Sequence, residues 1–275
     1  MEPKSMLWRR SMNNVNKTLY IPLYGKALVS KKGIILSDKK AETIWESVQF
    51  PLNGKSKSKW LAYYMGMRSA VFDNWLLEKR EKISDCVILH LGCGLDARAE
   101  RVGVSSPWYD VDFPSVIEER KNFYEETELY KMLSSDIREG DFLKEIEGAK
   151  NAVVVMEGVS MYLTNAELKG VFVKLKERFE NVSVLVDCYT PFAAKMSKIK
   201  NPIRGVGVTK VYGVASPSAL EGGTGLRFSR ELEITPKEMI EELEGRERCI
   251  FKTLYAGKTS KKLYKLYEYE GNFVE

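Results

Sequence analysis

The feature that most constrains this chain is a strand-length apolar run that breaks at two glycines. Residues 86–91 are rich in Val, Ile and Leu, and they are followed by Gly92 and Gly94 and by a predicted helix near Asp96. A strand that passes through a glycine turn into a helix presents backbone N–H groups to a ligand. Gly92 suits the turn, Gly94 leaves room beside the main chain, and Asp96 can cap the helix.

Taken by itself, this turn leaves the ligand open. Gly92, Gly94 and Ala97 fit the loose pattern G-x-G-x-x-G/A, and Asp112 lies 20 residues after Gly92, where an acidic residue binds a ribose in dinucleotide sites. Nicotinamide cofactors, flavins and S-adenosylmethionine all fit these requirements. An ordinary strand–helix turn without a ligand fits them as well.

Composition excludes several functional classes. Forty-three Lys and Arg residues nearly balance 38 Asp and Glu residues, so we expect no nucleic-acid partner. The four cysteines form no C-x-x-C pair, which favours reduced thiols in a cytoplasmic protein. The single histidine, His90, leaves little for a metal site or a Ser-His-Asp triad, and we interpret it as a core strand residue. For that reason we expect no metal. No apolar run of 18 residues exists, so we expect no membrane partner.

The rest of the chain alternates between predicted helices and strands. Helices are predicted over residues 14–30, with a kink or a new start at Pro22, and over 41–48, 59–80, 140–147, 165–179 and 236–244. Strands are predicted over 86–91, 107–112, 130–135, 152–156 and 182–187, with Pro114 starting a helix after the second. This alternation indicates a doubly wound parallel sheet. The runs 249–255 and 262–269 are predicted to form a terminal antiparallel hairpin.

The segment 190–232 interrupts the alternation. It contains six glycines after position 200, and we predict a long insertion that forms a lid, a substrate wall or a plain surface excursion. The chain is therefore expected to be one domain over residues 1–275, with a helical cap over 1–82, a core over 83–275 and the insertion within it.

Polar residues fall at the carboxyl ends of four successive predicted strands. Ligands of open α/β sheets bind at this edge, so Gly92, Asp112, Asp136 and Glu157 are predicted to share one rim. There Asp112 could accept hydrogen bonds from a ribose, and Asp136 could bind an adenine amino group. For Asp110, solvent exposure or a local salt bridge is the simpler interpretation.

An arginine lies within the apolar stripe of the helix predicted at 59–80. Because an unpaired buried charge is costly, Arg68 needs a partner. That partner is either one of the protein's own acids or a ligand carboxylate, and both alternatives stay open. The stripe consists of Trp60, Tyr64, Met67, Val71 and Trp75.

Three longer motifs are more specific than the glycine turn and resemble one protein family. Residues 92–98 (Gly-Cys-Gly-Leu-Asp-Ala-Arg), 109–117 (Tyr-Asp-Val-Asp-Phe-Pro-Ser-Val-Ile) and 157–164 (Glu-Gly-Val-Ser-Met-Tyr-Leu-Thr) resemble the leucine carboxyl methyltransferase superfamily. Residues 16–27, followed by Ser37 and Asp38, look closest to the branch named after the tetracenomycin polyketide O-methyltransferase. The resemblance favours S-adenosylmethionine over NAD as the cofactor.

The resemblance also implies a fold and site roles. It implies a Rossmann-like class I methyltransferase fold, with a mostly parallel seven-stranded sheet, an antiparallel C-terminal hairpin and an N-terminal helical cap. Arg68 matches the arginine that holds the methionine carboxylate, and Lys26 stands where relatives usually carry an arginine. The remaining matches are Gly92 beside the cofactor, Asp112 at the ribose, Asp136 with Ile137 at the adenine, and Glu157 after the fourth strand.

The predicted reaction is methyl transfer to an oxygen of a small molecule or of a protein C-terminus. A carboxylate acceptor needs no general base, whereas a hydroxyl acceptor does, and we assign no base. Tyr162 and Tyr189 are candidate wall residues. The alternatives are an NAD(P)-dependent oxidoreductase and a non-catalytic protein that binds S-adenosylmethionine.

Overall fold

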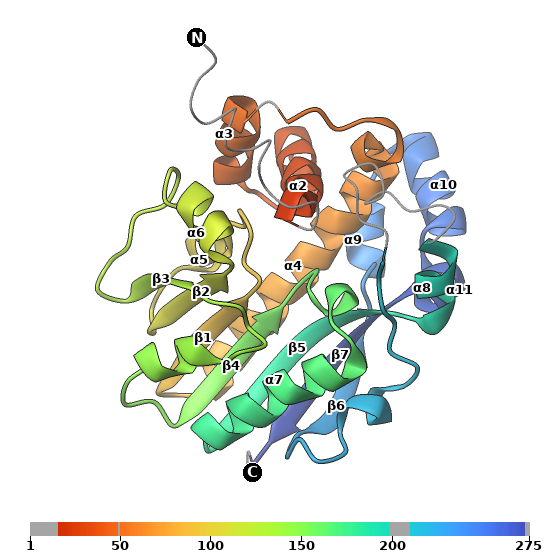
Figure 1. Ribbon diagram of the computed structural model, residues 1–275. Coiled ribbons are helices and arrows are strands. Elements are labelled where there is room, and N and C mark those ends of the chain that lie inside the picture. Colours follow the sequence, from red (N-terminus) through yellow and green to blue (C-terminus); the bar gives the residue numbers. More distant parts are fainter. Residues whose placement is uncertain (1–15, 49, 198–209, 273–275) are drawn as a thin grey trace.

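The computed structural model describes residues 16–48, 50–197 and 210–272, which form a seven-stranded sheet with helices on both faces (Figure 1). The strands are β1 (Cys86–Leu91), β2 (Trp108–Asp112), β3 (Tyr130–Ser134), β4 (Asn151–Met156), β5 (Asn181–Tyr189), β6 (Arg227–Leu232) and β7 (Tyr264–Gly271). Their order is β3-β2-β1-β4-β5-β7-β6, with β1–β5 parallel and β7 antiparallel to both of its neighbours. The predicted α/β class with a mostly parallel sheet is confirmed.

The central strands are apolar on both faces because helices cover both. All six residues of β1 are buried, and successive side chains enter opposite layers. Ile88 packs in the layer that contains α4 (Lys59–Lys82), and Leu89 packs in the layer that contains α7 (Asn165–Arg178). In Figure 1, α7 lies in front of the sheet and α4 behind it.

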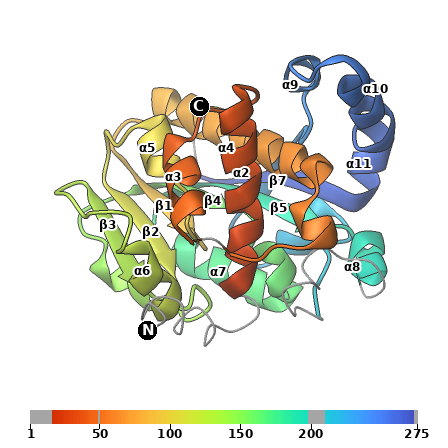
Figure 2. The same ribbon diagram turned by 90° about the horizontal axis from the view of Figure 1, so that it is seen from above.

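Helices from the start of the chain lie over the carboxyl ends of the strands (Figure 2). They are η1 (Asn16–Leu19), α2 (Tyr20–Lys32), α3 (Lys39–Val48) and η2 (Gly54–Lys57), followed by α4. Pro22 lies in the first turn of α2, where a missing backbone N–H costs no intrahelical hydrogen bond, so the new start predicted there is close to the observed one. Residues 14 and 15 of the predicted helix lie outside the described residues.

The remaining helices are shorter than α4. Thr164 and Glu167 form a capping box at the start of α7: the Thr164 hydroxyl accepts from the Glu167 backbone N–H at 3.2 Å, and the Thr164 N–H donates to the Glu167 carboxylate at 2.7 Å. The predicted cap at Asp96 was wrong, because its carboxylate binds cations instead and the helix begins after Ala97 without a side-chain cap. The others are α5 (Arg98–Val102), α6 (Pro114–Arg120), η3 (Asp141–Glu145), η4 (Ser160–Tyr162), α8 (Pro191–Ser197), η6 (Pro217–Leu220), α9 (Lys237–Glu241), α10 (Gly245–Leu254) and α11 (Gly257–Leu263).

The C-terminal antiparallel pair exists, but one of its strands was misplaced. Residues 249–255 were predicted as a strand, yet most of this run belongs to helix α10, and β7 pairs with β6. Phe251 and Tyr255 are four residues apart, which places them on one helical face. There Tyr255 stacks on Trp60 with ring centroids 5.7 Å apart, and Phe251 meets Tyr63 at 6.3 Å. This tertiary contact overrides the β propensity of the run.

The segment 190–232 is more regular than predicted. It contains α8, η6 and strand β6, whose side chains are mostly exposed because β6 is an edge strand. Residues 198–209 lie outside the described residues. Among the helices that the structure describes, none has the length and apolar character needed to cross a membrane.

Candidate functional site

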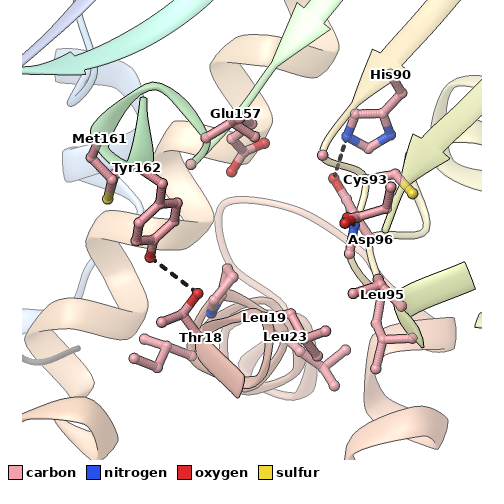
Figure 3. Close-up of a pocket in the computed structure, with 18 of the residues that line it drawn as sticks. Thr18, Leu19, Leu23, His90, Cys93, Leu95, Asp96, Glu157, Met161 and Tyr162 are labelled. Atoms are coloured by element: carbon pink, nitrogen blue, oxygen red, sulfur yellow. Dashed lines mark hydrogen bonds and ion pairs between the residues drawn. The ribbon is translucent and has the colours of Figure 1, made fainter. Parts of the chain in front are cut away.

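A cavity of about 430 Å³ lies between the carboxyl ends of the strands and the helices η1 and α2. Figure 3 shows part of its lining, with Glu157 and His90 on the strand side and Thr18, Leu19 and Leu23 on the helix side. All eight predicted cofactor residues line this one cavity, namely Lys26, Arg68, Gly92, Gly94, Asp112, Asp136, Ile137 and Glu157. The structure thus brings them together, while their role in binding stays a prediction.

The glycine turn after β1 is closely packed against the loop after β4 and against η1. Gly92 has φ +73°, and a Cβ built there would lie 2.1 Å from the Val159 side chain. Gly94 has φ +53°, and its Cβ would lie 3.4 Å from the Cβ of Leu19 in η1. Both backbone conformations favour glycine. Both glycines also line the cavity, as the sequence indicates.

The Asp112 carboxylate is oriented by the backbone. One oxygen accepts a hydrogen bond from the Gly94 N–H at 2.8 Å, and the other accepts one from the Phe113 N–H at 2.7 Å. Burial outweighs these two bonds and raises the pKa of Asp112 to about 6. A carboxylate with spare acceptor capacity in a cavity is suited to receive hydroxyl donors.

Arg68 is paired with the protein's own acids. Its Nε donates to Glu157 at 2.9 Å, and its Nη1 donates to Asp187 and to the Tyr264 hydroxyl, both at 2.9 Å. Its Nη2 has no hydrogen-bond partner among the described residues, and it lies 3.4 Å from the place where a Cβ on Gly158 would stand. Two acids therefore fix the guanidinium and leave one edge of it for a ligand.

Glu157 joins this arginine to a second one. Burial alone would raise the pKa of Glu157, but the guanidinium groups of Arg68 and Arg98 outweigh it and lower the pKa to about 2. Arg98 is fully buried and also donates to Asp73 of α4 at 2.7 Å. Glu157 therefore stays ionised at neutral pH and ties β4 to α4 and to the glycine turn.

Lys26 reaches the same network from α2. Its Nζ lies 2.7 Å from the Asp96 carboxylate, and Arg101 of α5 donates to that carboxylate at 2.6 Å. Lys26 is only 3% exposed. The positive charge at this position is thus used to hold α2 onto the glycine turn.

Asp136 and Ile137 lie at the end of β3. The Asp136 carboxylate accepts from Arg138 Nε at 3.0 Å, and this hydrogen bond lowers the pKa of Asp136. Ile137 is buried and presents an apolar side chain to the cavity. An adenine amino group that donates to Asp136 would therefore share this carboxylate with Arg138.

Asp110 and His90 are structural neighbours of the site. Asp110 is fully buried in a salt bridge with Arg120, so the local salt bridge is confirmed and solvent exposure was wrong. His90 is buried in the core as predicted, and its Nδ1 lies 3.2 Å from Asp110. Burial lowers the pKa of His90, which keeps the ring neutral at neutral pH.

Three tyrosines form a tyrosine end of the cavity, where β5 ends and β7 begins, and this end meets the charged residues where Arg68 donates to the Tyr264 hydroxyl. Tyr162 donates to the Thr18 hydroxyl at 3.0 Å and so links η4 to η1 (Figure 3). Tyr189 ends β5 and Tyr264 begins β7. No described residue of 190–232 lines the cavity, although Val211 packs in one cluster with Tyr162. A lid in this segment stays a prediction.

Sequence reasoning missed three residues of the site. Arg98 closes the glycine motif but was not given a role, and Tyr264 is far from every motif. Asp187 lies in the fifth strand, near its carboxyl end, so the rule that selected Asp112 and Glu157 could have found it. Among the described residues, no group of His, Cys, Asp and Glu is arranged to hold a metal ion.

Comparisons with known proteins agree with this geometry. The sequence profile described as leucine carboxyl methyltransferase matches residues 6–176, which is more than half of the chain. The tetracenomycin polyketide synthesis O-methyltransferase of Streptomyces glaucescens is 29% identical over 224 residues, which cover 80% of this chain and 83% of that protein. An S-adenosyl-L-methionine-dependent methyltransferase of Gibberella zeae is 25% identical over 142 residues, 47% of each chain.

Solved structures give more distant matches. Geranyl diphosphate C-methyltransferase from Streptomyces coelicolor superposes with a TM-score of 0.49 at 12% identity, covering 83% of this chain and 86% of that one. The family profile spans the glycine turn, Asp112, Asp136 and Glu157, which all face the cavity described above. The chain therefore belongs to the leucine carboxyl methyltransferase family and is an S-adenosylmethionine-dependent methyltransferase.

Proposed function

We propose that this protein transfers a methyl group from S-adenosylmethionine to a carboxylate oxygen of a small molecule. The observation that carries the proposal is that one cavity is lined both by charged residues and by three tyrosines, and that the two groups meet where Arg68 donates to Tyr264. The charged end fits a zwitterionic nucleoside, and the tyrosine end leaves room for an acceptor. The 29% identity to an O-methyltransferase supports oxygen as the acceptor atom.

The charged end offers a group for each part of the methyl donor. Asp112 would accept hydrogen bonds from the ribose hydroxyls, because the backbone holds both of its oxygens in place. Arg68 would bind the methionine carboxylate through Nη2, its edge without a described partner. Ile137 would pack on the adenine, with Asp136 beside it. Gly92 and Gly94 give the donor access to the backbone, and Lys26 and Glu157 hold this end together.

The available side chains favour a carboxylate acceptor over a hydroxyl. S-adenosylmethionine supplies an electrophilic methyl carbon on a cationic sulfur, and the electron pair of the broken C–S bond stays on sulfur when an acceptor oxygen lone pair forms the new bond. An ionised carboxylate has no proton to lose, whereas a hydroxyl requires a base. At the tyrosine end, Tyr162 and Tyr189 have pKa values raised by burial, so neither is a base at neutral pH.

Positioning is then the main task of the protein. Holding two reactants in line supplies up to about 7–11 kcal/mol of the barrier. The apolar and aromatic walls also exclude water, which favours a reaction between an anion and a cation that ends in two uncharged groups. An oxidoreductase has less support, because hydride transfer to or from an alcohol is coupled to the exchange of a proton near neutral pH, and burial raises the pKa values of Tyr162 and Tyr189 away from that range.

Calorimetry with S-adenosylmethionine and NADH tests the donor site. Wild type should bind S-adenosylmethionine, and Asp112→Asn should weaken this binding by about 10-fold to 100-fold, since hydrogen bonds to a charged group contribute about 1.5–3 kcal/mol. Asp141→Asn, which changes an exposed carboxylate outside the cavity, is the control and should bind like wild type. Binding of NADH without S-adenosylmethionine would overturn the proposal. Methyl release from labelled donor then distinguishes an enzyme from a non-catalytic binding protein.

A further inference from the structure

We propose that the Tyr189 hydroxyl donates a hydrogen bond to the methyl acceptor, and that the body of this acceptor is apolar. The inference rests on the proposed function, because it assigns the tyrosine end of the cavity to the acceptor. It gives Tyr189 a role in acceptor specificity that the sequence motifs do not indicate.

The tyrosine hydroxyls near this end differ in their partners. Tyr162 donates to Thr18 at 3.0 Å, Tyr264 donates to Asp187 at 2.7 Å, and the hydroxyls of Tyr64 and Ser260 are 3.0 Å apart. The Tyr189 hydroxyl has no hydrogen-bond partner among the described residues, although its ring lines the cavity. Tyr189 is partly exposed, so its hydroxyl is open to water, and an acceptor that displaces this water is expected to take over the hydrogen bond.

The ring of Tyr189 is held in place by its neighbours. Tyr189 and Tyr264 are paired across β5 and β7, and their rings meet edge to face at 4.9 Å. The carbonyl of Tyr189 accepts a hydrogen bond from the Val214 N–H at 2.8 Å. Backbone and ring are both fixed, so the hydroxyl is offered to an acceptor with little further loss of conformational freedom.

The protonation state of Tyr189 suits a donor. Burial raises the pKa of its phenol, and the neighbouring phenol of Tyr162 raises it further. The hydroxyl therefore carries its proton at every pH at which the protein would be assayed. It can donate to the acceptor carboxylate, and this interaction needs no charged protein group.

The surrounding walls indicate an apolar acceptor. Leu61, Met65 and Met161 line the cavity together with the tyrosines. The cations that line it among the described residues are Lys26, Arg68 and Arg138, and each already pairs with a protein carboxylate. A second anionic group on the acceptor would thus be desolvated without a cation to compensate it, which is costly.

Acid binding to the protein saturated with S-adenosylhomocysteine tests this inference. The probes are 1-naphthoic acid, decanoic acid and the dianion succinate, titrated by calorimetry, with methyl ester formation measured separately in S-adenosylmethionine. We expect at least one of the two apolar acids to bind, and succinate to bind at least tenfold more weakly. Tyr189→Phe keeps the ring and should weaken binding of the apolar acid about tenfold or more while leaving S-adenosylmethionine affinity unchanged. Tyr109→Phe, a half-buried tyrosine outside the cavity, should match wild type.

Each outcome has a separate meaning. Equal acid affinity in Tyr189→Phe and wild type would overturn the role of Tyr189. Failure of both apolar acids to bind, or equal binding of succinate, would overturn the apolar acceptor and leave the donor site intact. A wild-type protein that binds no S-adenosylmethionine would instead contradict the proposed function. Unchanged donor affinity in Tyr189→Phe shows that the variant is folded.

Discussion

The two ends of the cavity are built from different chemistry. At the donor end, Arg68, Arg98 and Lys26 pair with Glu157, Asp73 and Asp96 in buried or nearly buried ion pairs. At the acceptor end, Tyr162 makes a neutral hydrogen bond to Thr18 and Tyr189 makes an edge-to-face ring contact with Tyr264. The Tyr264 hydroxyl joins the two ends, because it accepts from Arg68 and donates to Asp187. A charged network fixes one geometry for a common cofactor, whereas neutral aromatic walls can be reshaped by single substitutions. The donor end is therefore expected to carry stability and the acceptor end specificity.

Removal of Arg98 should have the largest effect on stability. Arg98→Met removes one of the two buried cationic partners of Glu157, which keeps Arg68, and one of the two of Asp73, which keeps Arg101. We therefore expect a loss of about 3 kcal/mol in the free energy of unfolding, at the lower end of the cost of breaking a buried ion pair, measured by urea denaturation. At the acceptor end, Tyr162→Phe removes one neutral hydrogen bond and should cost about 1 kcal/mol. Lys144→Met, in an exposed pair with Asp141, should cause no measurable change. Equal losses in the first two variants would contradict the difference between the ends.

The donor end could be predicted from the sequence because each residue lies in a motif beside a strand end. β1 was predicted with its observed bounds, and Asp112 and Glu157 followed from the rule that ligands bind at carboxyl ends. At the acceptor end, Tyr162 and Tyr189 were named as candidate wall residues and both line the cavity. The pairing of Tyr189 with Tyr264 could not be predicted, because it joins distant segments and no local pattern encodes it. Contacts between distant segments also explain the wrong prediction of a strand at 249–255, because packing of this run on Trp60 stabilises a helix there.

The glycine turn should show the next largest effect, and a second glycine offers a matched control. Gly92 and Gly33 have φ values of +73° and +66°, so alanine is strained at both. A Cβ at Gly92 meets the Val159 side chain at 2.1 Å, whereas nothing lies within 4 Å of a Cβ at Gly33. Gly92→Ala should therefore lose about 1–3 kcal/mol more in the free energy of unfolding than Gly33→Ala, as measured by urea denaturation. Equal losses would mean that the loop of Val159 moves freely, and the donor end would then be less rigid than its ion pairs indicate.

The smallest expected effect is a difference in pH dependence between the ends. Burial raises the pKa of Asp112 to about 6, with backbone N–H groups and Arg120 opposing it and Asp110 adding to it. Ribose hydroxyls that donate to this carboxylate stabilise its ionised form, so donor binding should release a proton. Affinity for S-adenosylmethionine should then be constant above about pH 7 and fall by up to tenfold per pH unit below about pH 6.

Acceptor binding should lack this dependence. Tyr162 and Tyr189 stay protonated from pH 5.5 to 7.5. Carboxylic acids with pKa values of about 4 are mostly ionised over the same range. Calorimetry at pH 5.5 and 7.5 can measure both affinities, with acid titrations made in saturating S-adenosylhomocysteine. In Asp112→Asn the pH dependence of donor binding should disappear, because the titrating group is gone. If the donor affinity of this variant kept the pH dependence of wild type, the proton released on binding would come from another group than Asp112. His90 would be the next candidate, because it lines the same cavity and lies beside Asp110.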